Sequence, residues 1–179
     1  MAQTANIRNI ALIGHRGAGK TSLIESMLAA AGAIAAPGSV ERGTTVCDYD
    51  PLEKEHGHSL KVACAHFERD GVRVHLLDTP GYPDFAGRAM AALDAVESVA
   101  IVVNAQHGIE LSAARMALWA QTRRLCRFII VNRIDAEDVD LPACVEDLRN
   151  AFGQECLPLN LPADGATRVV DCFFSPEGA

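Results

Sequence analysis

The chain lacks the sequence features of several protein classes. Its six cysteines include no C-x-x-C pair, and no His and Cys residues cluster at zinc-binding spacing, which argues against a structural zinc site. There is no run of Lys or Arg and the formal net charge is -7, so a basic face for unaided, sequence-specific nucleic-acid binding is not expected. No apolar run approaches the roughly 20 residues of a membrane span, and the apolar stretch near the N-terminus is too short for a signal peptide. These absences favour a cytoplasmic protein with reduced thiols and no membrane partner.

What the chain does contain is an alternation of strand and helix patterns. With 179 residues and 49% hydrophobic content it can bury a sizeable core. Apolar runs predict strands at 7–13, 60–67, 72–77, 99–103 and 127–132, and helices at 20–31, 84–93, 110–124 and 141–152. Asp70-Gly71 predicts a hairpin between the second and third strands. The alternation predicts an α/β fold, with a mostly parallel sheet covered by helices on both faces.

Residues Gly14 to Thr21 read GHRGAGKT and lie between an apolar strand and a predicted helix. The pattern G-x-x-x-x-G-K-[ST] is a phosphate-binding loop, in which backbone N–H groups surround an anion. Lys20 would reach the β and γ phosphates, and the Thr21 hydroxyl would hold Mg²⁺. The helix N-terminus adds a further anion-stabilising feature, so the sequence predicts a nucleoside polyphosphate site.

A second motif, Asp78-Thr79-Pro80-Gly81, follows the predicted strand 72–77. A carboxylate at this strand end can hold Mg²⁺ through a water, and the Gly81 N–H can meet a γ-phosphate oxygen. Thr-Pro-Gly alone would be read as an ordinary turn, but the phosphate loop upstream favours a γ-phosphate sensor.

A third motif, Asn132-Arg133-Ile134-Asp135, ends the strand 127–132. Guanine presents two adjacent donors, N1–H and its amino group, and a carboxylate at Asp135 can accept both, whereas adenine presents an acceptor at N1. Asn132 would bond the base edge. A surface Asn and Asp ending a strand is common, but three nucleotide motifs in order, each at a strand end, are much rarer.

Together these segments resemble the guanine-nucleotide domain of an elongation factor G-like translational GTPase. The resemblance rests on GHRGAGKT (14–21), GTTVCDYDPLEKEHGHS (43–59), DTPGYPDF (78–85) and VNRID (131–135). It implies a P-loop fold, GTP and GDP as ligands with Mg²⁺, the ribosome as partner, and nucleotide-sensitive switches at 43–59 and 78–85.

The resemblance also assigns roles to residues that depart from the family pattern. Tyr82 replaces a His that orients the attacking water; a phenol can hydrogen-bond a water but supplies no imidazolium charge. Ser59 replaces a Thr that completes the Mg²⁺ shell, His58 replaces an apolar residue that gates the water, and Arg133 replaces a Lys that packs on the base. Such differences resemble an elongation factor G-like paralogue.

The candidate residues fall into three overlapping sets. Catalytic candidates are Lys20, Gly81 and Tyr82, and metal candidates are Thr21, Ser59 and Asp78. Nucleotide-binding candidates are Gly14, His15, Arg16, Gly17, Ala18, Gly19, Lys20, Thr21, Ser22, Asp78, Gly81, Asn132, Arg133 and Asp135.

Other polar residues receive structural interpretations. The side chains of His15 and Arg16 are expected to point to solvent and are left out of catalysis. The carboxylates of Asp48, Asp50, Glu53 and Glu55 are expected to be solvated in a long loop.

The sequence thus predicts a Mg²⁺-dependent GTPase of the elongation factor G type that acts in translation. An alternative is a nucleotide-gated module that docks on the ribosome or another partner with little hydrolysis; an ATP-using enzyme is disfavoured by Asn132 and Asp135. We expect a guanine-nucleotide domain over 1–160, without its final base-binding loop, and the start of an inserted subdomain over 161–179.

Overall fold

The computed structural model describes residues 4–174, which form two compact units. Within the described residues, the first unit comprises 4–103 and 110–130, and the second comprises 104–109 and 131–174. The strands are β1 (Ile7–Ile13), β2 (Ala63–Arg69), β3 (Val72–Asp78), β4 (Ser98–Asn104), β5 (Cys126–Asn132), β6 (Asn160–Ala163) and β7 (Arg168–Asp171). The helices are η1 (Thr4–Asn6), α1 (Lys20–Ala30), α2 (Pro51–His56), η2 (Pro83–Phe85), α3 (Ala86–Leu93), α4 (Leu111–Thr122) and α5 (Leu141–Phe152).

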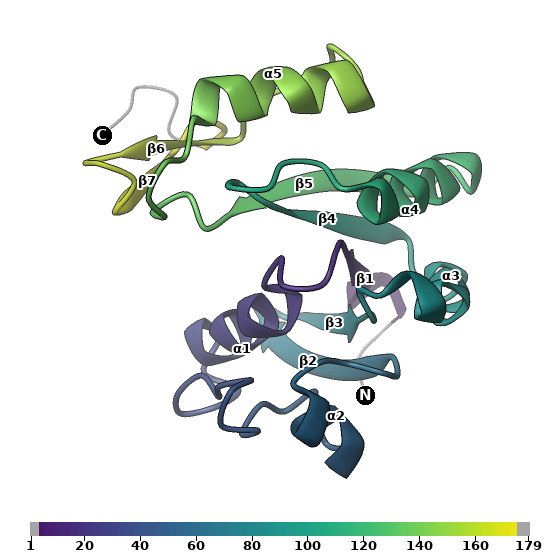
Figure 1. Ribbon diagram of the computed structural model, residues 1–179. Helices are drawn as coiled ribbons and strands as arrows, with labels where there is room; N and C mark the ends of the chain where they lie inside the picture. Colours follow the sequence, from purple (N-terminus) through teal and green to yellow (C-terminus); the bar gives the residue numbers. More distant parts are fainter. Residues whose placement is uncertain (1–3, 175–179) are drawn as a thin grey trace. The chain divides into compact units, whose positions relative to one another are not determined.

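The first unit is built on a five-stranded sheet with the order β2-β3-β1-β4-β5 (Figure 1). Strand β1 pairs in parallel with both β3 and β4, and β2 joins β3 in antiparallel orientation. The predicted hairpin is confirmed: Asp70 and Gly71, which link β2 to β3, have φ values of 52° and 75°, as tight hairpin turns require. The α/β fold with a mostly parallel sheet and one antiparallel strand is therefore confirmed.

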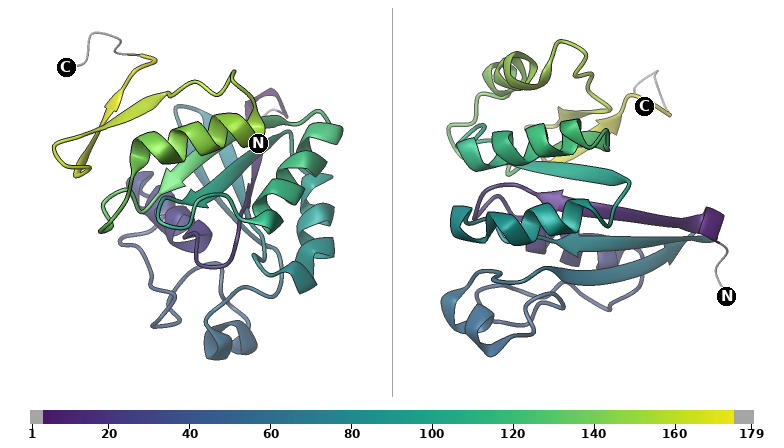
Figure 2. Two further views of the ribbon diagram at one scale, coloured as in Figure 1. Left: turned by 45° about the horizontal axis from the view of Figure 1, so that its top comes forward. Right: turned by 90° about the vertical axis from the view of Figure 1, so that its right-hand side faces the viewer.

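The C-terminal part of strand β1 is buried on both of its faces. Leu12 packs in a cluster with Ile24 and Leu28 of α1. Its neighbours Ala11 and Ile13, which point to the opposite face, are also fully buried. Helices α3 and α4 lie on that opposite side of the sheet, across from α1 (Figure 2). Burial of both faces explains why residues 10–13 are continuously apolar, whereas Arg8 and Asn9 nearer the start of the strand are polar and not buried.

Strand β2 begins later than the sequence predicts. Its first residue, Ala63, pairs with Asp78, the last residue of β3. Residues 60–62 therefore lie beyond the end of β3 and have no partner there, although their composition fits a strand.

The segment 33–58, expected to be an irregular loop, contains the helix α2. The Asp50 side chain accepts a hydrogen bond from the Leu52 N–H at 3.0 Å, Pro51 occupies the first helical turn, and Gly57 ends the helix with φ 63°. These are ordinary capping signals. The helix was missed because it is too short to show a hydrophobic period.

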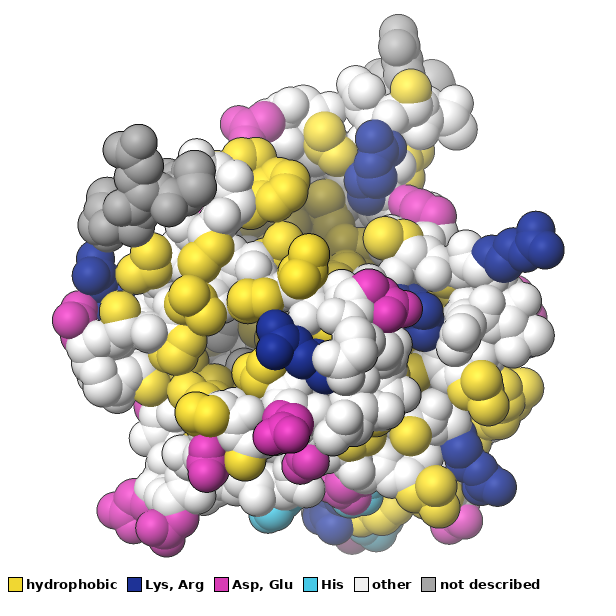
Figure 3. Space-filling model, turned by 90° about the horizontal axis from the view of Figure 1, so that it is seen from above, with side chains coloured by type: hydrophobic (Ala, Val, Ile, Leu, Met, Phe, Trp, Pro, Cys, Tyr) yellow, Lys and Arg dark blue, Asp and Glu magenta, His cyan; other side chains and the backbone are white. Residues whose placement is uncertain are grey.

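The second unit contains α5 and the hairpin β6–β7, whose strands pair from Asn160↔Asp171 to Ala163↔Arg168. Figure 3 views the molecule from the side of α5 and the hairpin and shows hydrophobic side chains exposed on this face. Exposed large hydrophobic residues of the second unit include Leu157, Leu159, Leu161, Val169, Phe173 and Phe174.

Two negative findings apply to residues 4–174. None of the helices in this range is both long and apolar enough to cross a membrane. All six cysteines are free, and Cys47 and Cys144 are buried, as expected for small core residues.

Candidate functional site

The phosphate loop connects β1 to α1 in a conformation that only glycine adopts easily. Gly14 has φ 149°, and a Cβ there would lie 2.3 Å from the carbonyl oxygen of Val102 on β4. Gly17 and Gly19 have φ values of 77° and 91°, which are also unfavourable for other residues. Helix α1 begins at Lys20 without a side-chain cap hydrogen bond, so its first N–H groups remain available to an anion.

The Lys20 ammonium group is held at this loop. Its Nζ donates hydrogen bonds to the carbonyl oxygens of Gly14 and His15, both at 2.9 Å, and its residue is only 6% exposed. Burial lowers the pKa of Lys20, while the charges of Asp78 and Glu110 act in the opposite direction. The structure therefore places a buried amine at the loop, as the motif predicts.

Asp78 lies beside the start of α1. The Thr21 hydroxyl donates a hydrogen bond to Asp78 Oδ2 at 2.5 Å, which joins the two motifs predicted to hold a metal. The other oxygen, Oδ1, is buried and has no hydrogen-bond partner among residues 4–174. Burial raises the pKa of the Asp78 carboxyl to about 6, against the attraction of Lys20 and the hydrogen bond from Thr21. A hydroxyl and a carboxylate with a spare oxygen are hard oxygen ligands, so these residues fit a magnesium ion.

The segment after Asp78 is fixed against the phosphate loop. The buried Thr79 hydroxyl donates to the Leu12 carbonyl oxygen at 2.6 Å. At Gly81, a Cβ would lie 2.5 Å from Arg16 N and 2.7 Å from Lys20 Nζ. Only glycine can approach the loop so closely, and the structure thus brings the first two sequence motifs together.

The acidic residues of the loop correct the expectation that all four are solvated. Asp48 and Glu53 are 3% and 2% exposed. Asp48 accepts hydrogen bonds from the hydroxyls of Thr45 (2.7 Å) and Ser59 (3.3 Å). Glu53 Oε1 accepts the backbone N–H groups of residues 60 and 61 at 2.8 and 2.9 Å. These carboxylates are buried because they bond the chain that folds back over them.

A third buried carboxylate, Glu25 on α1, was not singled out by the sequence. Its Oε2 accepts the Gly38 N–H at 2.8 Å and its Oε1 accepts the Val46 N–H at 2.6 Å. Glu25 is 1% exposed and so anchors the loop to the helix that follows the phosphate loop. The sequence signal that could have revealed this anchor is a Glu placed on the apolar side of α1.

Ser59, predicted to be a metal ligand, contacts Asp48 through its hydroxyl. Its predicted partners Thr21 and Asp78 instead bond each other. The metal role of Ser59 stays a prediction.

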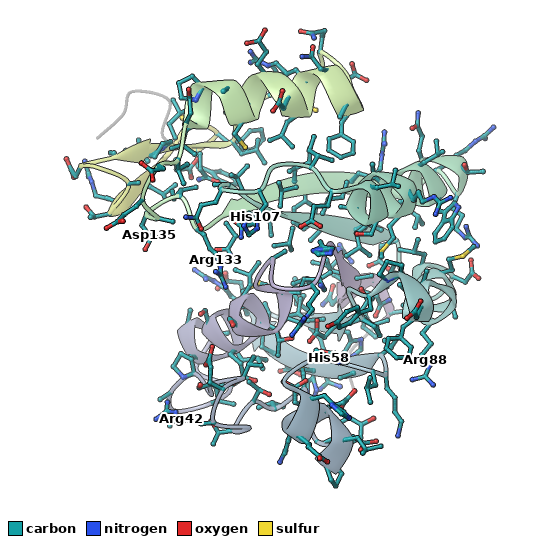
Figure 4. All side chains as sticks on the ribbon, viewed as in Figure 1. Arg42, His58, Arg88, His107, Arg133 and Asp135 are labelled. Carbon is teal, nitrogen blue, oxygen red and sulfur yellow. The ribbon has the colours of Figure 1, made fainter. Side chains whose placement is uncertain are left out.

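Arg16 is exposed, as expected, and His15 is half-buried, but the side chain of each also has a protein contact. His15 Nδ1 lies 2.7 Å from Glu110 Oε1. The guanidinium carbon of Arg16 lies 5.0 Å from the centroid of the Tyr82 ring. The His58 ring meets the same ring at 4.5 Å in an edge-on arrangement, and Figure 4 shows His58 on the segment after α2.

The predicted base-binding motif lies in the second unit. The Asn132 carbonyl oxygen accepts the Ala105 N–H at 2.9 Å, which ties the motif to the loop after β4. Arg133 has φ 58° and, like Asp135, is exposed on the turn after β5 (Figure 4). The Asp135 carboxylate is thus open to solvent, as a group that accepts a ligand must be. Its role in selecting guanine stays a prediction.

No group of three or more His, Cys, Asp or Glu side chains within residues 4–174 could hold a metal by itself. The only metal position that the described contacts favour therefore depends on the Thr21 hydroxyl together with Asp78.

Comparison with known proteins gives consistent matches over this chain. The model of the elongation factor Tu GTP-binding domain matches residues 5–172. An elongation factor G-like protein of Mycobacterium tuberculosis is 38% identical over 168 residues, covering 90% of this chain and 23% of that protein. The mitochondrial ribosome-releasing factor 2 of Drosophila willistoni is 41% identical over 162 residues, covering 89% of this chain and 22% of that protein. A crystal structure of a Thermus thermophilus protein superposes with a TM-score of 0.88 at 38% identity, covering 94% of this chain and 26% of that one. The chain spans about a quarter of the length of the relatives it matches.

Proposed function

Because the chain belongs to the family of the elongation factor Tu GTP-binding domain, we propose that it binds GTP and GDP with Mg²⁺ and hydrolyses GTP. We further propose that it does so as part of a translation factor of the elongation factor G type that works on the ribosome in the cytoplasm. The relatives named as elongation factor G-like protein and ribosome-releasing factor support this assignment.

The observation that carries the proposal is the buried Asp78 carboxylate. Its Oδ1 lacks a hydrogen-bond partner among the described residues while its Oδ2 accepts the Thr21 hydroxyl. Leaving an acceptor unpaired in the interior is costly. A magnesium ion held by Thr21 and Asp78 would satisfy that oxygen and neutralise its charge. We add Ser59 to the metal site as the third predicted ligand.

Each remaining candidate takes one role in this proposal. Lys20 and the Gly81 N–H stabilise the negative charge that develops on the γ-phosphate. Tyr82 positions the attacking water. In the second unit, Asn132 and Asp135 select guanine, and Arg133 packs on the base. No general base is needed, because phosphoryl transfer depends chiefly on positioning and electrostatics.

A second function is favoured by one specific observation, the presence of Tyr82. A neutral phenol cannot supply the charge of an imidazolium. The alternative is therefore a module that closes on GTP and docks on the ribosome while hydrolysing it very slowly.

We also propose that residues 161–179, of which 175–179 lie outside the described residues, begin a subdomain inserted into the nucleotide domain. The exposed leucine and phenylalanine side chains of the β6–β7 region support this division, since a hairpin with so much exposed apolar surface is suited to packing against further protein.

The proposed function is tested by measuring binding of GTP, GDP and ATP, each with Mg²⁺, to the full-length protein. Turnover of GTP is then followed with and without ribosomes. We expect GTP and GDP to bind, ATP to compete poorly, and ribosomes to accelerate turnover. Equal competition by ATP would contradict guanine selection, and absence of turnover with ribosomes would favour the docking module.

The role of Asp135 is tested by Asp135→Ala. We expect GTP and GDP affinities to fall by about a hundredfold or more, because a charged acceptor of two hydrogen bonds is lost, each worth about 1.5 kcal/mol or more. Glu146→Ala, which removes an exposed carboxylate on α5, is the matched control and should leave both affinities unchanged. Equal affinities in Asp135→Ala and wild type would remove Asp135 from the base site.

A further inference from the structure

Three side chains from three separate segments meet at Tyr82. Arg16 comes from the phosphate loop, His58 from the segment after α2, and Tyr82 from the segment after β3. The Arg16 guanidinium carbon lies 5.0 Å from the Tyr82 ring centroid, and the His58 ring lies 4.5 Å from it with an interplanar angle of 62°. We call this group the Tyr82 clamp.

We propose that Arg16 is a positioning residue for GTP hydrolysis, which acts by holding the Tyr82 ring between its guanidinium group and His58. The inference rests on the proposed function, because it assigns Arg16 to that same site. It gives Arg16 a role that its exposed position alone would not suggest.

The contacts favour the ring of Tyr82 over its hydroxyl as the part that is held. The described side-chain contacts of Tyr82 are made by its ring, which has Arg16 and His58 as partners. A guanidinium over an aromatic ring is attracted by the negative face of the π-system. Lysine carries the same charge but lacks the planar group that stacks on the ring.

The position of Arg16 in the chain connects the clamp to the phosphate end of the site. A Cβ on Gly81 would lie 2.5 Å from the backbone nitrogen of Arg16. Arg16 therefore touches the segment 81–82 twice, through its main chain at Gly81 and through its side chain at Tyr82. Lys20 Nζ approaches the same glycine, at 2.7 Å from that Cβ position.

The nearby pair of Arg88 and Phe85 differs from the clamp. The Arg88 guanidinium lies 5.5 Å from the Phe85 ring centroid and also donates to the Leu60 carbonyl oxygen. Neither residue belongs to the phosphate loop, so this pair ties α3 to the chain before β2 without reaching the site.

Because the clamp joins all three segments, its loss should affect hydrolysis more than binding of the diphosphate. GDP presents no γ-phosphate to the segment at Gly81, and its affinity depends on the phosphate loop and the base motif. Freeing the Tyr82 ring would leave these contacts in place but would let the segment 81–82 move relative to Arg16.

The experiment is a double-mutant cycle on the full-length protein, using Arg16→Ala, Tyr82→Ala and the combination. Single-turnover GTP hydrolysis on ribosomes and affinity for GDP are measured for each. Arg16→Lys and Tyr82→Phe test the planar group and the ring. Arg115→Ala, which removes an exposed arginine on α4, controls for the change in net charge.

We expect Arg16→Ala to slow hydrolysis about two- to fivefold, the strength of an exposed cation–π pair. Addition of Arg16→Ala to Tyr82→Ala should slow hydrolysis no further, because the contact is already lost. Arg16→Lys should recover part of the rate. Tyr82→Phe keeps the ring, so adding Arg16→Ala to Tyr82→Phe should slow hydrolysis by the same factor as adding it to wild type. GDP affinity should stay unchanged in all variants.

If Arg16→Ala and Tyr82→Ala slow hydrolysis by factors that multiply in the double variant, the clamp is overturned. A wild-type rate of hydrolysis in Arg16→Ala would overturn it as well. Either result would leave the proposed function intact. A wild-type protein that fails to bind GTP or GDP would overturn the proposed function itself. Unchanged GDP affinity in each variant also shows that the variant is folded.

Discussion

Substitution of Asp78 by Asn tests the central feature of the site, a carboxylate that is costly to ionise when no metal is bound. Burial raises its pKa from 3.8 to about 6. This difference of about two pH units corresponds to about 3 kcal/mol, since each unit is worth about 1.4 kcal/mol. Asn has nearly the same shape, can still accept the Thr21 hydroxyl hydrogen bond, and carries no charge.

The sign of the effect follows from proton binding. Between about pH 4 and pH 6 the folded protein keeps the Asp78 proton that the unfolded chain releases, so the free energy of unfolding falls as the pH rises. Above pH 6 the full cost is present. Metal-free Asp78→Asn should therefore be more stable than wild type by up to about 3 kcal/mol at pH 7. The difference should disappear below pH 4, where both side chains are neutral.

The measurement is urea unfolding in EDTA from pH 3.5 to 8, followed by circular dichroism. Asp147→Asn, at an exposed position on α5, is the control and should change stability by less than about 0.5 kcal/mol. With Mg²⁺ and GDP present, wild type should be more stable than Asp78→Asn, because wild type then gains binding free energy that the variant lacks. A metal-free variant less stable than wild type at pH 7, or a difference independent of pH, would refute the reasoning.

Two further predictions concern the segments around the phosphate loop. Gly81→Ala should weaken GTP binding and hydrolysis, because its Cβ would meet the backbone of Arg16. Gly87→Ala is the control, because a Cβ there meets nothing within 4 Å. It should leave GTP binding and hydrolysis unchanged in nucleotide-binding and turnover assays. Glu25→Ala should lower the free energy of unfolding by about 3 kcal/mol, since two partly buried N–H groups lose a charged acceptor. In urea titrations the exposed Glu55→Ala should change it by less than about 0.5 kcal/mol, and equal effects of the two would exclude Glu25 as an anchor.

Local sequence patterns were sufficient for most of the secondary structure. The span of β1 and that of α5 agree with the predicted ranges, and Gly32, at φ 74°, follows the end of α1 as expected. The start of β2 could not be predicted from local sequence, because it depends on where the partner strand β3 ends. Helix α2 could have been found from Asp50, Pro51 and Gly57, whose capping roles are local.

The candidate site likewise has features that the sequence predicted and features that it did not. The glycine spacing of residues 14–19 fixed the phosphate loop in advance, because positive φ values and close approach to Val102 require residues without a Cβ. Burial of Asp48 and Glu53 was not predictable, since a carboxylate in a loop is solvated unless distant backbone donors return to it.

By itself, the sequence determined the loop that can surround a phosphate, the order of the strands along the chain, and the carboxylates placed at strand ends. Those features depend on residues that are neighbours in the chain. Only the tertiary structure decided that Thr21 meets Asp78, that Glu25 anchors residues 38 and 46, and that Arg16 lies over Tyr82. These contacts join residues from separate segments, and their existence depends on how the sheet brings the ends of β1 and β3 together.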